Sequence, residues 1–252
     1  MNTINNSTIR IGNFTSSEIV ALMSNPTAKA MKEGAIFGAP ALTYIKECNI
    51  ERRLGRSITS ESNARPLTWG KITEKLNFDK LGLEYILTST ESDKHPTIDC
   101  WSGSKDGIKH DQGKTVIDLK SPITLKSFCE LVDCKTIEDV RENHKDGEKY
   151  YWQLVSNAII NDCAHAELIV CMPYKSELQN IRDYCADQPT DQLYKYYWIV
   201  NAHDDELPYL PDNGYYKNVN IIRFDVSEEV KKGLTERVQL AKCLLNNFYK
   251  PE

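Results

Sequence analysis

The sequence lacks any long hydrophobic run: nowhere do 18 or more apolar residues follow one another, as a membrane-spanning helix would require. Its start, MNTINNSTIR, has neither the basic region nor the apolar stretch of a secretory signal peptide. We therefore expect a protein without a membrane span, and the cytoplasm is its expected location.

Cysteine pairs at metal-binding spacing are also missing. None of the eight cysteines forms a CxxC motif, and none is accompanied by paired histidines. This argues against zinc and iron–sulfur sites and predicts reduced, mostly structural thiols. The cysteines stand at positions 48, 100, 129, 134, 163, 171, 185 and 243.

Glycine and proline are scarce, with 12 and 10 of 252 residues, and 40% of the chain is hydrophobic against 27% charged. This is the composition of a globular protein, and it excludes collagen, coiled-coil and disordered chains. The length is ample for a hydrophobic core without disulfide bonds or metal ions to support it.

An overall excess of positive charge is absent too, since the formal net charge is -5. Binding of nucleic acid through total charge is therefore not expected. The charge is uneven, however: residues 26–80 carry ten Lys or Arg against six Asp or Glu, whereas residues 177–230 carry four against eleven. We expect a polyanion to meet the N-terminal part.

Hydrophobic spacing and turn residues predict one α/β domain. The segment Thr15-Ser16-Ser17-Glu18 has the order of a capping box, so a helix is expected to begin there. Further helical spacing covers 41–56, 66–80, 124–163 and 230–248. Strands are expected at 83–88, 97–102, 115–121, 167–172, 194–201 and 219–226.

The chemistry is concentrated in a turn and the strand that follows it. Side chains alternate along a strand, so Asp118 and Lys120 share one face. Asp106, in the turn of residues 102–108, can bring a second carboxylate beside them. Two carboxylates suit a hard cation such as Mg²⁺, and a lysine can orient or activate a water for attack on phosphorus. This combination is typical of phosphodiester hydrolysis.

Two helices offer further polar groups. Gly70 and Glu74 are four residues apart and lie on one helix face, where glycine permits close approach of a substrate and Glu74 offers a third carboxylate. Gln153 and Asn157 form a polar stripe on a later helix, suited to holding water or phosphate near the site.

Other interpretations stay open at this stage. Each of the turn and strand motifs is common by itself and compatible with a structural role. Asp99 is an alternative to Asp106 as the metal ligand. The run His203-Asp204-Asp205-Glu206 looks like a metal cluster but is better explained as a solvated acidic loop, because consecutive loop residues cannot all converge.

Five segments in this order resemble the lambda exonuclease / YqaJ-type viral recombinase family of the PD-(D/E)xK nuclease superfamily, over roughly residues 10–175. The resemblance implies an α/β fold with a PD-(D/E)xK, restriction-endonuclease-like core, in which helices flank a central mixed β-sheet. It further implies one nuclease domain over 1–252, with N-terminal helices of about 1–80 contributing DNA contacts and a nuclease core of about 66–252. The segments are Thr15-Ser16-Ser17-Glu18, Trp69-Gly70-Lys71-x-x-Glu74, Ser104-Lys105-Asp106-Gly107, Asp118-Leu119-Lys120-Ser121-Pro122 and Tyr151-x-Gln153.

The resemblance also implies the roles of the site residues. Asp106, Asp118 and the backbone carbonyl of Leu119 would bind one or two Mg²⁺ or Mn²⁺ ions, and Lys120 would be the catalytic lysine. Glu74 would assist through a metal-bound water or a second metal, and Gln153 would lie near the lysine. The sequence departs from the family pattern twice: Lys105 replaces the usual proline, and aspartate stands at 118 where many members have glutamate.

A second set of residues is implied in DNA binding. Arg10, Thr15 and Ser17 fall where the family holds the 5' phosphate of the digested strand, and the free N–H groups of a helix start would attract a phosphate there. Further candidate DNA contacts are Arg52, Arg53, Arg56, Arg65, Lys71 and Lys105. Arg52, Arg53 and Arg56 equally fit a solvated helix end.

The activity implied is metal-dependent 5'-to-3' exonuclease digestion of double-stranded DNA ends, in phage or prophage recombination. The implied partners are two further copies of the chain, in a homotrimeric ring, and a single-strand annealing protein. The alternatives are a restriction or repair endonuclease of the same superfamily and a catalytically silent DNA-binding protein. Two carboxylates that face each other argue against a catalytically silent protein, because like charges repel each other when no cation is bound.

Overall fold

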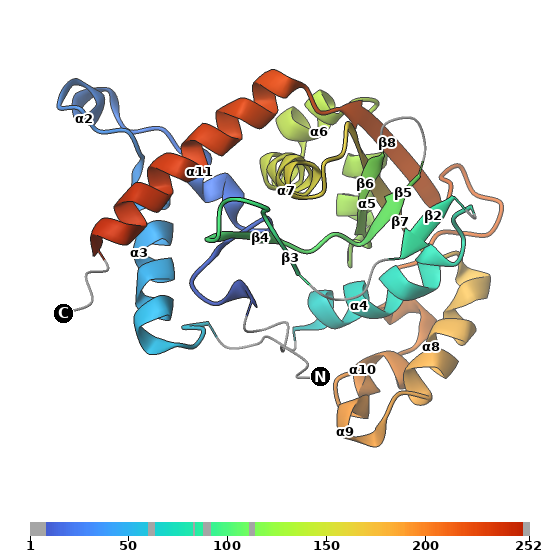
Figure 1. Ribbon diagram of the computed structural model, residues 1–252. Helices are drawn as coiled ribbons and strands as arrows, with labels where there is room; N and C mark the ends of the chain where they lie inside the picture. Colours follow the sequence, from blue (N-terminus) through green and yellow to red (C-terminus); the bar gives the residue numbers. More distant parts are fainter. Residues whose placement is uncertain (1–8, 60–63, 83, 88–91, 111–113, 249–252) are drawn as a thin grey trace.

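The computed structural model describes residues 9–59, 64–82, 84–87, 92–110 and 114–248, and its main feature is a five-stranded mixed β-sheet (Figure 1). The strand order is β2-β5-β6-β7-β8, in which β6 and β7 are parallel and the other neighbours are antiparallel. The strands are β2 Tyr85–Leu87, β5 Gly107–Lys109, β6 Thr115–Lys120, β7 His165–Cys171 and β8 Val219–Asp225.

Strands β6 and β7 form the buried middle of this sheet. Their apolar runs are typical of strands covered on both faces, and nearly every side chain in them is buried. Asp118 in β6 and Glu167 in β7 are the buried charged residues of these two strands. A buried charge requires a partner, so each of them marks a polar site inside the sheet.

A small second sheet lies beside the first. Its order is β1-β4-β3, formed by Phe14–Thr15, Trp101–Gly103 and Asp93–Lys94. The parallel pairing of β1 with β4 places Thr15 opposite Ser102. This pairing brings the N-terminal segment next to the turn that precedes Asp106.

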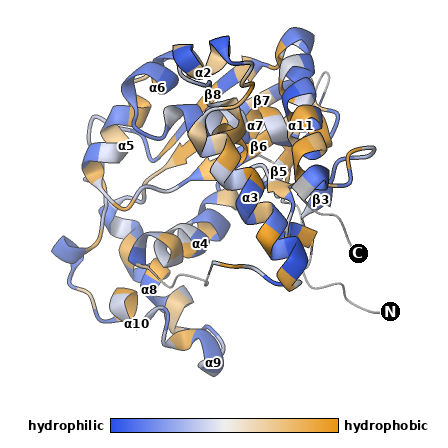
Figure 2. Cartoon of the chain, turned by 90° about the vertical axis from the view of Figure 1, so that its left-hand side faces the viewer, coloured by the Kyte–Doolittle hydropathy of each residue, from blue (hydrophilic) through white to orange (hydrophobic). Residues whose placement is uncertain are grey.

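Helices flank both sheets. Helix α7 packs against β6, β7, β4 and the 3-10 helix η1, and α11 packs across α7, α3 and η1 (Figure 1). Figure 2 shows hydrophobic residues gathered around α7, β6 and β7, whereas the peripheral α6 is largely hydrophilic. The helices are η1 Ile19–Met23, α2 Ala28–Lys32, α3 Ala39–Leu54, α4 Arg65–Phe78, α5 Leu125–Val132, α6 Ile137–Asn143, α7 Gly147–Ile160, η2 Lys175–Glu177, α8 Leu178–Ala186, α9 Thr190–Leu193, α10 Tyr197–Val200, η3 Asp204–Glu206 and α11 Glu228–Phe248.

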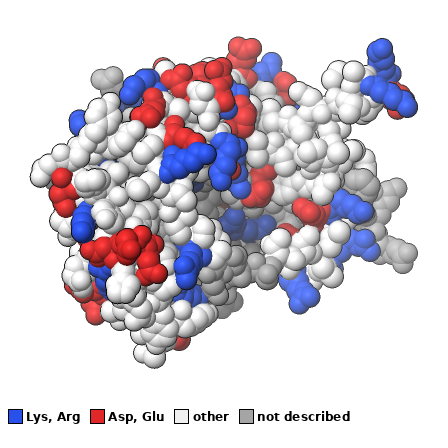
Figure 3. Space-filling model, turned by 180° about the vertical axis from the view of Figure 1, so that it is seen from behind, with Lys and Arg blue, Asp and Glu red and all other residues white. Residues whose placement is uncertain are grey.

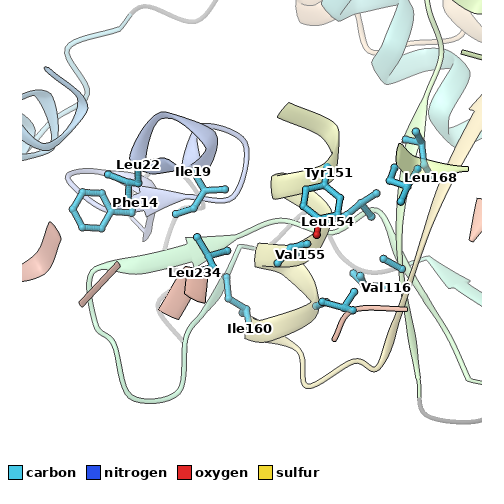
Figure 4. Packing of buried hydrophobic residues seen from close by; sticks show 14 of the residues in the cluster. Phe14, Ile19, Leu22, Val116, Tyr151, Leu154, Val155, Ile160, Leu168 and Leu234 are labelled. Atoms are coloured by element: carbon cyan, nitrogen blue, oxygen red, sulfur yellow. The ribbon is translucent and has the colours of Figure 1, made fainter. Parts of the chain in front are cut away.

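The main hydrophobic core has α7 at its centre. Figure 4 shows Leu154 and Val155 of α7 between the side chains of η1, such as Ile19, and those of the sheet, such as Val116 and Leu168. All five side chains are fully buried. Helix α7 is therefore held from both sides and provides a rigid support for the polar residues that it carries.

A separate hydrophobic cluster joins α4 to the segment between β7 and β8. Trp69 and Ile72 of α4 pack there with Ile181 of α8 and Ile199 of α10. Figure 1 shows α8, α9 and α10 below α4, away from the five-stranded sheet. The cluster fixes α4, which carries Glu74, against these helices.

The expected mixed sheet flanked by helices is confirmed, whereas the strand predicted at 194–201 is wrong. Residues Tyr197–Val200 form the helix α10, and Tyr196 and Ile199, three residues apart, are buried in the α4 cluster. The aromatic and β-branched residues of this segment favour strands, but burial of one helical face decides the structure. Among the described helices, none is both long and apolar enough to cross a membrane.

Three other segments differ from the prediction in detail. The predicted strand 97–102 is reduced to Trp101–Gly103, and 124–163 is divided into the three helices α5, α6 and α7. No capping box forms at Thr15: the 3-10 helix η1 begins later, after Glu18, without a side-chain cap. The hydroxyls of the segment have other partners, since Ser16 bonds Ser156 and Ser17 accepts from Arg10.

Candidate active site

The site begins at the carboxyl end of β6. Asp118 and Lys120 project from the same face of the strand, and their side chains form an ion pair with Lys120 Nζ 2.7 Å from Asp118 Oδ2. The Asp118 side chain is only 1% exposed. The alternation of strand side chains therefore produces the predicted juxtaposition, in a nearly water-free position.

Asp106 joins this pair because β5 and β6 are antiparallel neighbours. Gly107 pairs with Ile117, and the Asp106 N–H donates to the Ile117 carbonyl. The Asp106 carboxylate in turn accepts a 2.6 Å hydrogen bond from the backbone N–H of Leu119. The register of the hairpin thus places the second carboxylate beside the middle residue of Asp118-Leu119-Lys120.

Glu74 approaches from α4 as the third carboxyl group. Its side chain lies close to those of Asp106 and Asp118, which influence its pKa. Burial, followed by the negative charge of Asp118, raises the pKa of Glu74. Burial and the charges of Asp118 and Glu74 raise the pKa of Asp106 well above its usual range. In the absence of a cation these groups compete for protons, as like charges in one pocket must.

Lys120 remains a cation in this setting. Burial by itself would lower its pKa, but the neighbouring carboxylates of Asp118 and Asp106 outweigh burial and hold the pKa above its ordinary value. The ammonium group therefore donates hydrogen bonds at neutral pH and is unsuited to accept a proton.

Helix α7 holds the other side of the site. Gln153 Nε2 donates to Asp118 Oδ1 at 2.7 Å, and one turn later Asn157 Nδ2 donates to the Ser104 carbonyl at 3.0 Å. The two amides, which the sequence suggested as binders of water or phosphate, thus contact a carboxylate and the turn before Asp106. They hold Asp118 and the turn before Asp106 in position.

The donor set fits a hard cation. Asp118 Oδ2 is buried, and apart from its ion pair with Lys120 it has no hydrogen-bond partner among the described residues. Within the described ranges, no group of three or more His, Cys, Asp or Glu side chains is arranged to hold a metal ion, so a cation here would also need backbone or water oxygens as ligands. Oxygen donors in small number suit Mg²⁺, which retains several waters, better than Zn²⁺, which prefers nitrogen and sulfur.

The alternative ligands lie elsewhere. Asp99 is exposed and pairs with Lys242 of α11 at 2.6 Å, and this hydrogen bond lowers the pKa of Asp99. In the acidic run after Ala202, Asp204 pairs with Arg182 at 2.7 Å, and Glu206 accepts from the His203 N–H. These contacts explain both segments without a metal ion.

The predicted phosphate residues gather in a pocket of about 550 Å³ between the N-terminal segment and α3, hereafter the strand-end pocket. Arg10 donates to Ser17 Oγ at 3.1 Å, and Thr15 Oγ1 lies 3.3 Å from the same atom. The hydroxyl of Tyr44, which the sequence did not single out, accepts from the Thr15 N–H at 2.8 Å. Its contact spans 29 residues, so no local motif signals it.

The strand-end pocket is mixed in charge. Besides Arg10 its described lining includes Glu18, Glu47 and Glu51. Glu18 pairs with Lys149 at 3.0 Å, and Glu51 accepts from the Gly12 N–H at 2.9 Å. Most of the carboxylates are thus engaged, and the Arg10 guanidinium faces the two hydroxyls.

The other candidate DNA contacts have diverse surroundings. Arg52 donates to the Gly12 carbonyl at 2.7 Å and supports the N-terminal turn, whereas Arg53 and Arg56 are exposed at the end of α3. Arg65 lies over the Trp198 ring, Lys71 is exposed on α4, and Lys105 pairs with Asp93. Figure 3 shows basic and acidic side chains interspersed on one face of the molecule, around a central hollow.

Comparison with known proteins shows that the chain shares its fold with solved structures. No family model and no curated protein sequence matches the chain. An alkaline exonuclease from Laribacter hongkongensis matches with a TM-score of 0.61 at 14% identity, over 97% of this chain and 93% of that one. Its structure in complex with dAMP matches with a TM-score of 0.58 at 15% identity, over 96% and 91%.

A phage-related exonuclease from Haemophilus somnus 129PT has a similar structure. It matches with a TM-score of 0.60 at 15% identity, over 93% of this chain and 94% of that one. At such low identity the likeness establishes the fold alone, which is the mixed α/β fold of these two exonucleases, with helices flanking a sheet as the sequence predicted.

Proposed function

We propose that this protein is a metal-dependent DNA exonuclease that hydrolyses phosphodiester bonds at the ends of double-stranded DNA in the 5'-to-3' direction. One observation carries the proposal: carboxyl groups from α4, the β5 turn and β6 converge on Lys120 in a fold shared with solved exonucleases. The dAMP bound to the Laribacter enzyme supports DNA as the polymer. The phage-related neighbour supports a setting in phage or prophage recombination.

In this proposal Asp106 and Asp118 hold one or two Mg²⁺ or Mn²⁺ ions, with the Leu119 carbonyl and Glu74 as further ligands. When bound, the metal would neutralise the phosphoryl oxygens and favour ionisation of the attacking water. Gln153 keeps Asp118 in place through its 2.7 Å hydrogen bond. The Lys120 ammonium, already protonated, orients the water and donates to the negatively charged phosphoryl group.

The strand-end pocket would receive the 5' phosphate of the digested strand. Arg10, Thr15 and Ser17 present a guanidinium and two hydroxyls, which are phosphate-binding groups. Replacing Ser17 and Arg10 by alanine should slow digestion of 5'-phosphorylated duplex far more than of 5'-hydroxyl duplex. Equal wild-type rates on the two substrates would contradict this part of the proposal.

Digestion of end-labelled linear duplex, compared with covalently closed circles, tests the function. With Mg²⁺ we expect labelled nucleotides from the linear duplex alone, and with EDTA we expect none. Nicking or linearisation of the circles would favour the restriction or repair endonuclease of the same superfamily. Binding of duplex without any hydrolysis would favour a silent DNA-binding protein.

A further inference from the structure

A buried cluster of hydrogen bonds lies where β1, β4 and α7 meet. The Ser16 and Ser156 hydroxyl oxygens are 2.8 Å apart, and the Trp101 indole N–H donates to Ser156 Oγ, also at 2.8 Å. The three residues are at most 2% exposed. We call Ser16, Trp101 and Ser156 the serine cluster. Its central hydroxyl contacts two segments that are remote from α7 in the sequence.

The serine cluster joins the two functional regions described above. Ser16 stands between Thr15 and Ser17 of the strand-end pocket, and its N–H donates to the Ser102 carbonyl. Ser156 stands on α7 between Gln153, which holds Asp118, and Asn157, which holds the Ser104 carbonyl two residues before Asp106. Helix α7 therefore contacts the N-terminal segment of the strand-end pocket through Ser156, and it also carries the two amides that support the carboxylates.

The packing around this junction is unusually close. A Cβ added at Gly103 would lie 2.1 Å from Ser16 Oγ and 2.2 Å from Asn157 Oδ1, so only glycine fits between them. Asn157 Oδ1 and Ser102 Oγ are buried without a hydrogen-bond partner among the described residues. Unpartnered buried groups oppose folding. Stability alone therefore does not explain why these segments are held so closely.

We propose that Ser156 is a positioning residue that sets the distance between the strand-end pocket and the carboxylates. That distance selects which phosphodiester bond, counted from the bound 5' end, reaches Asp106, Asp118 and Lys120. The serine cluster would thus determine the cutting register. The inference rests on the proposed exonuclease function and adds to it the structural element that decides product length.

The test compares Ser156→Ala with a matched variant, Ser127→Ala, which removes a hydroxyl that bonds His144 outside the serine cluster. The first product released from 5'-labelled linear duplex is sized, and kcat and KM are measured with 5'-phosphate and 5'-hydroxyl ends. For Ser156→Ala we expect first products of mixed length and a fall in kcat of about tenfold to a hundredfold, because small misplacements of a scissile bond are costly. Ser127→Ala should keep the wild-type product.

Ser16→Ala keeps the inference testable if Ser156→Ala does not fold, because Trp101 retains its bond to Ser156. A variant that is merely less stable lowers all rates alike and leaves product length unchanged. Wild-type product length and end preference in folded Ser156→Ala or Ser16→Ala would overturn the inference and leave the proposed function intact. Failure of the wild-type protein to digest linear duplex would overturn both.

Discussion

At the scale of single residues, the main feature is a group of carboxyl groups that repel each other without a cation. Asp106 is half-buried, and its pKa is raised by desolvation and by the charges of Asp118 and Glu74. A carboxyl group with a higher pKa in the folded chain than in the unfolded chain takes up its proton preferentially in the folded state. The metal-free protein should therefore lose stability as pH rises from the ordinary carboxyl range towards the raised pKa.

Asp106→Asn should abolish Mg²⁺-dependent hydrolysis and make the metal-free protein more stable at neutral pH. Asparagine can still accept the hydrogen bond from the Leu119 N–H, but it carries no charge. Each 1 kcal/mol gained would raise Tm by roughly 2–4 °C for a chain of this size. Thermal melts in EDTA across a pH series measure the gain, which should shrink in acid, where Asp106 itself is protonated.

The opposite results would remove Asp106 from the site. Retained hydrolysis in the purified variant would show that this carboxylate is dispensable. A variant less stable than wild type in EDTA at neutral pH would show that other groups already stabilise the charge of Asp106 in the metal-free protein.

Lys120→Ala should lower the rate of hydrolysis by about 10²- to 10³-fold, the range for removing one donor that stabilises negative charge in the transition state. Mg²⁺ binding should persist, because the ammonium contacts Asp118 without being a ligand. Calorimetric titration with Mg²⁺ checks this, with Lys126→Ala on the exposed face of α5 as the control. Loss of Mg²⁺ binding in Lys120→Ala would assign the lysine a role in building the metal site.

At the scale of elements, α4 carries Glu74 but depends on distant helices for its position. Trp69, fully buried in α4, packs against Trp198 with ring centroids 6.4 Å apart, and Trp198 donates to Thr68 Oγ1 at 3.0 Å. The indole N–H of Trp69 has no partner among the described residues. The Trp69 ring thus stabilises the position of α4 through packing alone.

Trp69→Ala should therefore destabilise the protein by about 3–5 kcal/mol, the usual cost of removing a buried aromatic side chain. Trp69→Phe should cost far less, because it keeps an aromatic ring and removes a buried, unpaired donor. Urea denaturation measures both. Equal costs for the two variants would show that the indole N–H has a partner.

At the scale of the whole molecule, the question is how a chain of net charge -5 would hold a polyanion. Both signs of charge are interspersed on the face in Figure 3, so attraction must come from local groups. We propose a homotrimeric ring, lined by the N-terminal part and working with a single-strand annealing protein. The candidate lining residues are Arg53, Arg56, Arg65 and Lys71, with Arg52 supporting the turn beside them.

Light scattering at micromolar concentration should give the mass of three chains, and digestion should be processive because a closed ring retains the strand between cuts. Binding of duplex should weaken steeply with salt, since phosphate contacts release counterions. A monomer with full processive activity would rule out the ring. Dissociation after every cut would rule out retention of the strand.

The sequence by itself determined the parts of the site that depend on local periodicity. The alternation of β6 predicted that Asp118 and Lys120 share a face, and the hairpin signal before it predicted that Asp106 would lie beside them. The strands predicted at 115–121 and 167–172 are confirmed as β6 and β7. These features depend on neighbours within about 15 residues, so a pattern in one sequence can specify them.

Only the tertiary structure decided the features that depend on distant contacts. Residues 194–201 were predicted as a strand, but Tyr197–Val200 form a helix, because Tyr196 and Ile199 are buried against α4. Thr15 contacts Tyr44 instead of capping a helix, and Ser16 bonds Ser156 across 140 residues. A hydroxyl takes whichever partner the fold brings within hydrogen-bonding distance, and local spacing carries no information about partners so far along the chain.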